Sequence, residues 1–387
     1  MVQGKLGSWS MCQVGGALMS KPIRVLHVVV NMNRGGAETL IMNLYRNIDR
    51  SKVQFDFLTC KEGVFDNEIK ELGGIIHRIP YINEVGHFGY IKSLNDFFSK
   101  NNHYTIVHSH LNRMSGLVVR AAKKFGIRYC IAHSHNTGGE GGLLTKGYKW
   151  YAGLFIPSNS DYTFACSQAA AKWLFGNKSN EATLLNNGIE PEMFSYSPDK
   201  RIEKRRKLGI DDQLVIGHVG RFNKQKNHKF LIEIFAEFVK RRPDSILLLC
   251  GDGVLRKVIE NRVNQLNLQE KVKFLGVRSD IHQLLQAFDI FLFPSLHEGL
   301  PVTLIEAQAA GIPCVISDEI TKEVDLGLDL MKFLNLSNLD LWVEELEKCN
   351  VKKLERYTSN LKKLRERGYD IKNTAEWLQD FYLANAR

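Results

Sequence analysis

The chain has 387 residues, of which 44% are hydrophobic and 24% charged, and it carries 52 Lys and Arg against 42 Asp and Glu. This length predicts two or three domains, and the composition is that of a globular protein, which excludes a largely disordered chain. No stretch reaches the ~18 apolar residues of a membrane-spanning helix. The seven cysteines include no C-x2-C pair, which argues against a zinc ribbon or a redox motif.

Strands and helices are predicted to alternate along the first half of the chain. Residues 1–20 lack the features of a secretory signal, and we expect them to be a disordered extension. The apolar, β-branched run Ile23 to Val30 predicts a buried strand, and Gly35 and Gly36 predict a turn before a helix over Ala37 to Asn47. Further strands are predicted at 55–60, 105–110, 129–133, 162–166 and 182–185, with a helix at 115–125. This alternation indicates βαβ units and a mostly parallel sheet.

The same pattern starts again in the second half. The polar segment Ser195 to Gln213 contains Pro198 and a run of four basic residues at 204–207, and it is predicted to be a linker. Strands are predicted at 214–219, 246–250, 272–275, 290–293 and 314–317, with helices at 229–241, 254–266 and 281–287. We therefore predict one domain over residues 21–195, a second over 196–369, and a final amphipathic helix at about 370–387.

Two glutamates, Glu298 and Glu306, stand seven residues apart in a segment predicted to begin a helix. Gly299 and Pro301 lie at its start, and the free N–H groups at a helix N-terminus attract phosphate. Eight positions are a little over two helical turns, so the two carboxylates project on roughly the same side. Carboxylates accept hydrogen bonds from hydroxyl groups. The segment therefore suits a nucleotide-sugar, which offers both a diphosphate and hydroxyls.

Two cations follow the predicted strand at 214–219. Arg221 and Lys226 are placed at the carboxyl edge of the second sheet, where α/β proteins bind ligands. Arginine holds a phosphate bidentately and lysine adds a point charge. An isolated pair with this spacing is most often surface charge, but beside the Glu298 segment it favours a diphosphate site.

Other side chains leave alternatives open. His133 and His135 point the same way from a strand, so zinc is one interpretation, but no further ligand stands at a usual spacing and we expect no metal. The chain has no G-x-G-x-x-G fingerprint, which disfavours a Rossmann oxidoreductase that binds NAD.

Residues 1–195 carry 21 Lys and Arg against 14 Asp and Glu, a net charge of +7. The basic residues around the helix at 115–125 are either a solvated face or a contact with anionic lipid; they are Arg113, Arg120, Lys123, Lys124 and Arg128. No nucleic-acid motif appears.

The Glu298 to Glu306 segment resembles the E-x7-E signature of retaining glycosyltransferases of family 4, which have the GT-B fold. The resemblance covers about residues 21–318 and is greatest to enzymes of capsular and exopolysaccharide synthesis. It extends, in the family's order, to NMNRGGAE at 31–38, NNGIEPEMF at 186–194, Gly220-Arg221 with Lys226, GDG at 251–253 and FLG at 274–276. Asn186 stands where proline is usual, and the sequence departs from the family after Asp318.

This resemblance implies an α/β fold of two Rossmann-like domains whose parallel sheets face an interdomain cleft. The domain of residues 21–195 would bind the acceptor, the domain of residues 196–369 would bind the donor, and the final helix would pack back onto the first domain. Arg221 and Lys226 would hold the diphosphate without a metal, Glu298 and His135 would lie near the reacting sugar, and Glu306 would hold the ribose hydroxyls. The other residues that it places along the donor are Gly35, Gly36, Val277, Arg278, Gly299, Leu300, Pro301 and Val302.

The expected activity is transfer of a hexose, with retention, from a nucleotide-sugar to a hydroxyl of a lipid-linked or growing saccharide in cell-surface polysaccharide synthesis. A UDP-sugar is the expected donor, with no further cofactor, and the expected location is the cytoplasm, at the inner face of the cell membrane. The alternative is a non-catalytic GT-B subunit that scaffolds or activates a partner transferase. Donor sugar, linkage and oligomeric state stay open.

Overall fold

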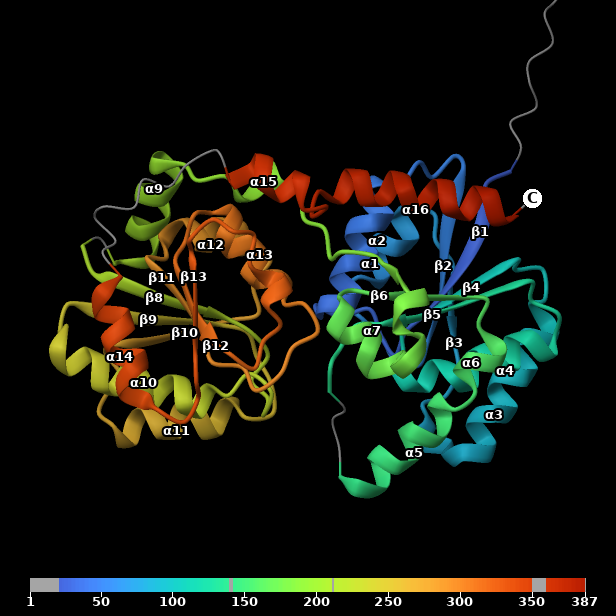
Figure 1. The fold of residues 1–387 in the computed structure, drawn as a ribbon, viewed down its shortest axis with the longest axis horizontal. Helices are drawn as coiled ribbons and strands as arrows, with labels where there is room; N and C mark the ends of the chain where they lie inside the picture. The colour runs from blue at the N-terminus through green and yellow to red at the C-terminus, as the bar shows by residue number, and fades with distance from the viewer. Residues whose placement is uncertain (1–20, 139–141, 211, 350–359, 387) are drawn as a thin grey trace, which may run out of the picture.

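The protein folds into two lobes, each built on its own β-sheet (Figure 1). The structure is a computed structural model that describes residues 21–138, 142–210, 212–349 and 360–386. The extension predicted at residues 1–20 lies outside the described residues. Among the described residues, no helix combines the length and the apolar character needed to cross a lipid bilayer.

The first lobe contains a seven-stranded sheet of order β3-β2-β1-β4-β5-β6-β7, in which every neighbouring pair is parallel. Its strands are β1 (Ile23–Val28), β2 (Val53–Thr59), β3 (Ile76–Arg78), β4 (Ile106–Ser109), β5 (Tyr129–Ser134), β6 (Tyr162–Ala165) and β7 (Thr183–Leu184). The helices of this part of the chain are α1 (Gly36–Asn47), α2 (Asp66–Glu71), α3 (Ile82–Lys100), α4 (Ser115–Lys124), α5 (Leu143–Gly153), α6 (Ile156–Asn159), α7 (Gln168–Phe175) and α8 (Pro191–Phe194), with 3₁₀ turns at Asn112–Met114 and Gly176–Glu181. β2 is buried along its whole length because helices cover both faces of the sheet.

The second lobe contains a six-stranded parallel sheet of order β10-β9-β8-β11-β12-β13. Its strands are β8 (Leu214–Val219), β9 (Ser245–Cys250), β10 (Val272–Gly276), β11 (Ile290–Phe293), β12 (Cys314–Ser317) and β13 (Met331–Leu334). The remaining helices are α9 (Pro198–Leu208), α10 (His228–Arg241), α11 (Arg256–Gln265), α12 (Ile281–Ala287), α13 (Val302–Ala309), α14 (Leu339–Lys348), α15 (Asn360–Glu366) and α16 (Ile371–Ala386), with a 3₁₀ turn at Lys322–Val324. The predicted parallel pairing is confirmed in both lobes.

The segment predicted as a linker is largely helical. Residues 198–208 form α9, which starts at Ser197, whose hydroxyl accepts from the Lys200 N–H, and ends at Gly209 in the left-handed conformation. Lys204 and Arg205 are buried in ion pairs with Asp280 and Asp289. The sequence did not predict these ion pairs, because the carboxylate partners stand 76 and 84 positions further along the chain.

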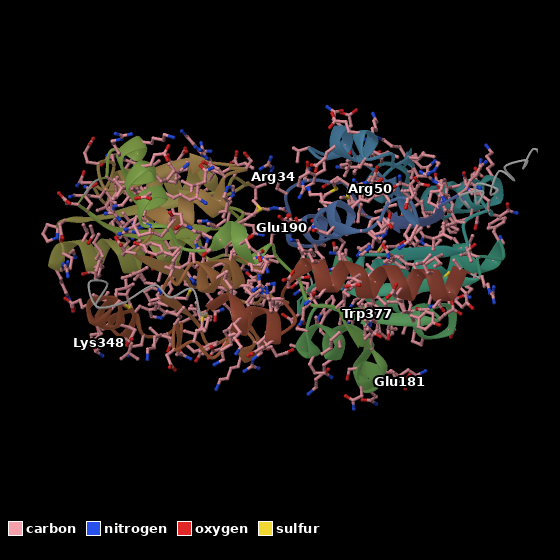
Figure 2. All side chains as sticks on the ribbon, turned by 90° about the horizontal axis from the view of Figure 1, so that it is seen from above. Arg34, Arg50, Glu181, Glu190, Lys348 and Trp377 are labelled. Atoms are coloured by element: carbon pink, nitrogen blue, oxygen red, sulfur yellow. The ribbon has the colours of Figure 1, made fainter. Side chains whose placement is uncertain are left out.

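The C-terminal helix α16 crosses onto the first lobe (Figure 1). Its buried face includes Leu378 and Tyr382, which join the core formed by β1, β2 and α1. The Tyr382 hydroxyl lies 2.6 Å from Nδ1 of His108 on β4. Figure 2 shows Trp377 on the outer side of this helix, and Arg34 and Glu190 at the junction between the lobes.

Replacing Leu378 by alanine tests how strongly α16 is anchored. Leu378 is fully buried, so the change should lower the free energy of unfolding of the first lobe by about 2–5 kcal/mol. Urea unfolding measures this difference. Glu376→Ala, on the exposed side of the same helix, is the control and should stay within about 0.5 kcal/mol of wild type; equal effects of the two changes would contradict the packing.

Candidate active site

The Glu298 segment lies between β11 and α13. Helix α13 begins at Val302, directly after Pro301, and no side chain among the described residues caps it. The first N–H groups of a helix have no partner within it, so they are available to an anion. The helix starts later than predicted: Gly299 and Pro301 precede it instead of opening it. Glu298 therefore lies outside the helix, and the prediction that helical spacing puts Glu298 and Glu306 on the same side was wrong.

Three side chains of the first lobe hold the backbone of this segment. Each donates a hydrogen bond to one of three successive carbonyl oxygens: Thr137 to Glu298 at 2.7 Å, Ser167 to Gly299 at 2.9 Å and Asn187 to Leu300 at 3.2 Å. A Cβ on Gly299 would lie 2.4 Å from the backbone oxygen of His135, so only glycine permits this approach. The segment is therefore part of the junction between the lobes.

Lys226 and Glu298 form an ion pair at the centre of the site. Lys226 Nζ lies 2.7 Å from Glu298 Oε1, and both side chains are largely withdrawn from solvent. The ammonium also lies 4.5 Å from the centre of the Phe293 ring, which stabilises a cation further. Burying two charges is favourable only while they stay paired or find another partner. A phosphate that drew Lys226 away would therefore release Glu298 for a hydroxyl donor.

The first lobe also faces Arg221. Burial raises the pKa of the Glu38 carboxyl, and the charge of Arg221 partly opposes that rise, which places Arg221 near the start of α1. Arg34 donates a hydrogen bond of 3.0 Å to the backbone oxygen of Arg278, which connects the lobes. Gly35 and Gly36 lie between these contacts, and a Cβ on Gly36 would meet no described atom within 4 Å. The structure leaves space beside Gly36 that a ligand can approach.

Val277 and Arg278 follow β10 and are both exposed. The Arg278 guanidinium pairs with Asp280 at 2.8 Å, and this pairing together with Lys204 lowers the pKa of the Asp280 carboxyl. The structure thus places Arg278 at the junction, through its carbonyl contact with Arg34. A role for Val277 and Arg278 in holding the base stays a prediction.

Glu306 lies on α13, about one turn after the helix begins at Val302. Burial raises the pKa of its carboxyl to about 7, so the group changes charge near physiological pH. Val302 precedes it on the same helix and is partly buried. An ionised Glu306 accepts hydrogen bonds only, which suits the hydroxyls predicted there.

His135 turns its side chain into the first lobe. Its Nε2 lies 2.9 Å from Nδ1 of His110, and its ring stacks on His133 with 3.9 Å between the ring centres. Burial lowers the pKa of His135 to about 3, so the imidazole is neutral at physiological pH. The backbone of His135 contacts the Glu298 segment, and its imidazole belongs to a histidine cluster that the sequence did not predict. A role for His135 near the reacting sugar stays a prediction.

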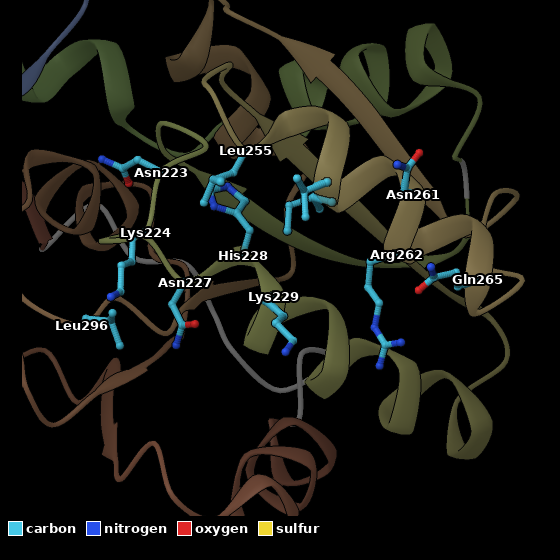
Figure 3. A pocket seen from close by; sticks show the side chains of 12 residues that line it. Asn223, Lys224, Asn227, His228, Lys229, Leu255, Asn261, Arg262, Gln265 and Leu296 are labelled. Atoms are coloured by element: carbon cyan, nitrogen blue, oxygen red, sulfur yellow. The ribbon is translucent and has the colours of Figure 1, made fainter.

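A pocket of about 510 Å³ lies in the second lobe, between α10 and α11 (Figure 3). It is lined by Asn223, Lys224, Asn227, His228, Lys229, Leu255, Val258, Ile259, Asn261, Arg262, Gln265 and Leu296. None of the predicted site residues is among them, so this pocket is distinct from the predicted donor site although the loop before α10 borders both.

Sequence reasoning missed the residues that hold the two lobes together at the site. Each of these residues follows a strand of the first sheet: Thr137 follows β5, Ser167 follows β6 and Asn187 follows β7. Because α/β proteins bind ligands beyond the carboxyl ends of their strands, this position could have identified them from the sequence. Asn187 lies within the quoted segment at 186–194, but nothing in the sequence shows that its amide meets the carbonyl of Leu300.

Two parallel α/β sheets that meet at a site of paired charges beside a free helix N-terminus define a GT-B type of protein. Comparison with known proteins agrees. The profile "Glycosyl transferases group 1" matches residues 200–325, and "Glycosyltransferase Family 4" matches residues 34–193. The chain belongs to this glycosyltransferase family.

Individual relatives span nearly the whole chain. The putative glycosyltransferase EpsF of Bacillus subtilis is 39% identical over 93% of this chain and 96% of its own length. An Escherichia coli protein named as a UDP-Gal:alpha-D-GlcNAc-diphosphoundecaprenol alpha-1,3-galactosyltransferase is 25% identical over 93% of this chain and 97% of its own. Among solved structures, Anabaena HepE in complex with UDP-glucose superposes on this chain with a TM-score of 0.78. The superposition covers 94% of this chain and 100% of the HepE chain, at 19% sequence identity, and it therefore supports the fold.

The raised pKa of Glu306 predicts that the difference in stability between Glu306→Gln and the wild-type protein depends on pH. Between the unfolded value of about 4.5 and the folded value of about 7, the folded protein binds more protons, so this group lowers the free energy of unfolding as pH rises. Glu306→Gln cannot ionise, so its melting temperature relative to wild type should be higher at about pH 8 than at about pH 5. Glu319→Gln, on an exposed loop, controls for the loss of a carboxylate. A difference between Glu306→Gln and wild type that does not change with pH would contradict this prediction.

Proposed function

We propose that the protein is a retaining glycosyltransferase that moves a hexose from a UDP-sugar to a hydroxyl of a lipid-linked saccharide during cell-surface polysaccharide synthesis. The observation that carries this proposal is the Lys226–Glu298 pair at 2.7 Å, placed before the free N-terminus of α13 and within reach of the first lobe. Cations, helix N–H groups and a carboxylate together match a sugar diphosphate.

In the proposed reaction, Arg221 and Lys226 bind the diphosphate and stabilise the charge that develops as it leaves. The bond between the anomeric carbon and the phosphate oxygen breaks, and the acceptor oxygen bonds to that carbon from the same face. The acceptor proton goes to the departing phosphate oxygen. The enzyme contributes positioning and electrostatic stabilisation, which need no metal at the diphosphate.

The donor and acceptor are proposed from the relatives. HepE was solved with UDP-glucose, and the E. coli relative is named for transfer from UDP-Gal to a sugar on diphosphoundecaprenol. A further relative is named as the capsular polysaccharide biosynthesis glycosyltransferase CapH of Staphylococcus aureus. A UDP-hexose and a polyprenyl-diphosphate saccharide are therefore the substrates we propose, and with them a location in the cytoplasm at the inner face of the membrane.

A surface of the first lobe supports contact with that membrane. We name it the α5 surface: Leu143, Leu144 and Trp150, which are 89%, 92% and 58% exposed, with the exposed Lys146 between them. Helix α5 packs against α4, which carries exposed basic residues of the predicted cluster. Exposed leucines and a tryptophan beside cations match the interface of a bilayer that contains anionic lipid.

The alternative, a scaffold subunit without activity, is not favoured. It would not need Arg221, Lys226, Glu298 and Glu306, which are all present and which the structure gathers around the start of α13 and the loop after β8.

Removing Arg221 tests the proposed donor site. Arg221→Ala should lower turnover of UDP-glucose or UDP-galactose about 10- to 150-fold, the effect of losing a hydrogen bond from a charged group worth ~1.5–3 kcal/mol. Release of UDP measures turnover. Arg242→Ala, whose guanidinium pairs with Asp244 on the surface, is the control and should leave turnover unchanged. Wild-type turnover in Arg221→Ala would contradict the assignment of Arg221 to the diphosphate site.

The same reaction mixture tests retention. The product of an α-linked donor should be α-linked, and the anomeric coupling in its proton NMR spectrum reports this directly. A β-linked product would overturn the retaining mechanism.

Membrane contact is tested on vesicles. Leu144→Glu should weaken binding to vesicles of phosphatidylglycerol and phosphatidylcholine about 10- to 150-fold, because one inserted leucine contributes ~1.5–3 kcal/mol. Co-sedimentation measures the bound fraction. Val254→Glu is the matched control, since Val254 is 90% exposed on the second lobe. Equal binding by both variants and wild type would rule out the α5 surface.

A further inference from the structure

Five histidines gather on one face of the first sheet. His27 comes from β1, His108 and His110 from the end of β4, and His133 and His135 from the end of β5. These three strands are neighbours in the sheet, and residues two apart on a strand project to the same side. This face is covered by α16, since Tyr382 reaches His108.

The imidazoles contact one another in two chains. His27 Nδ1 lies 3.0 Å from His110 Nε2, and His110 Nδ1 lies 2.9 Å from His135 Nε2. In the second chain, His108 Nε2 lies 3.1 Å from His133 Nδ1. Two nitrogens at the open end of the cluster, His133 Nε2 and His135 Nδ1, are buried and have no hydrogen-bond partner among the described residues.

Unpaired nitrogens of this kind need an explanation. A buried polar atom without a partner costs roughly 1–3 kcal/mol, and native proteins leave few of them. A neutral imidazole with a free lone pair is the form that binds a metal ion.

Two triads have ligand nitrogens within 4.8 Å of one another: His27 with His108 and His110, and His110 with His133 and His135. The first is fully buried. The second contains both unpaired nitrogens of the open end, and His135 is partly exposed with its backbone against Gly299, which gives an ion a route from the junction.

We propose that His110, His133 and His135 form a binding site for one divalent transition-metal ion, with Zn²⁺ as the best match. Three imidazoles and one open position are an established zinc ligand set, and imidazole also suits Cu, Ni and Fe. Tetrahedral zinc with Zn–N bonds of ~2.0–2.1 Å sets its ligand nitrogens roughly 3.3 Å apart. The ligand nitrogens of this triad lie within 4.8 Å of one another, so they would draw together by up to about 1.5 Å around the ion.

This assignment also gives the other two histidines a role, although His27 Nε2 stays buried and without a partner among the described residues. Metal-bound imidazoles donate their second N–H to an outer partner. His110 has His27 at its Nε2, and His133 has His108 at its Nδ1, so His27 and His108 are those partners. The ion would brace the end of β5, from which Thr137 holds the carbonyl of Glu298. It does not replace Arg221 and Lys226, which belong to the other lobe.

Metal titration tests the site without any assay of transfer. The full chain, purified without a histidine tag and stripped with a chelator, is titrated with Co²⁺ and followed by visible d–d absorption, and with Zn²⁺ by calorimetry. We expect one ion per chain. His110→Gln and His135→Gln should weaken binding by more than the roughly 10–100-fold that loss of an outer partner costs, and His27→Gln should fall within that range.

The control is His103→Gln, since His103 is exposed and outside the cluster. It should bind metal as wild type does. Absence of stoichiometric Co²⁺ or Zn²⁺ binding by the wild-type chain would overturn the site and leave a hydrogen-bonded imidazole chain. Wild-type affinity in His135→Gln would overturn it as well. The wild-type titration decides the question even if a variant fails to fold.

Discussion

The buried ion pair between Lys226 and Glu298 is the contact on which the arrangement of the site depends. Each charge has left water, and neither would be tolerated there alone. The pair therefore keeps the loop after β8 and the segment before α13 together in the absence of ligand. In the proposed reaction, a diphosphate that takes Lys226 as its partner would compensate that charge and free the carboxylate, which would couple binding of the donor to preparation of the sugar site.

The same segment is held from the other lobe through its backbone. Hydroxyls of Thr137 and Ser167 and the amide of Asn187 donate to three successive carbonyls, which leaves the side chain of Glu298 free for its ion pair. Backbone contacts of this type fix the position of the chain and do not depend on which side chains it carries. The Glu298 segment is thus part of the second lobe and is held in place by the first.

The histidine cluster lies directly behind this contact. The end of β5 carries His133 and His135 into the core and then Thr137 into the junction, so whatever stabilises the cluster also stabilises the contact with Glu298. Helix α16 adds a second constraint, because Tyr382 meets His108 from a part of the chain that has just left the second lobe. A bound ion and the crossing helix would therefore act on the same layer of the first lobe.

The sequence by itself determined the two parallel α/β halves and the order of the motifs, because strand runs, glycine turns and the Glu298 to Glu306 spacing are local patterns. It also indicated Arg221 and Lys226 as site residues, from their position after β8. Only the tertiary structure showed that Lys226 pairs with Glu298, that the basic run at 204–207 contributes to buried ion pairs, and that His110 joins His133 and His135. These contacts link residues as far as 84 positions apart, and local chemistry carries no signal for the partner across such a distance.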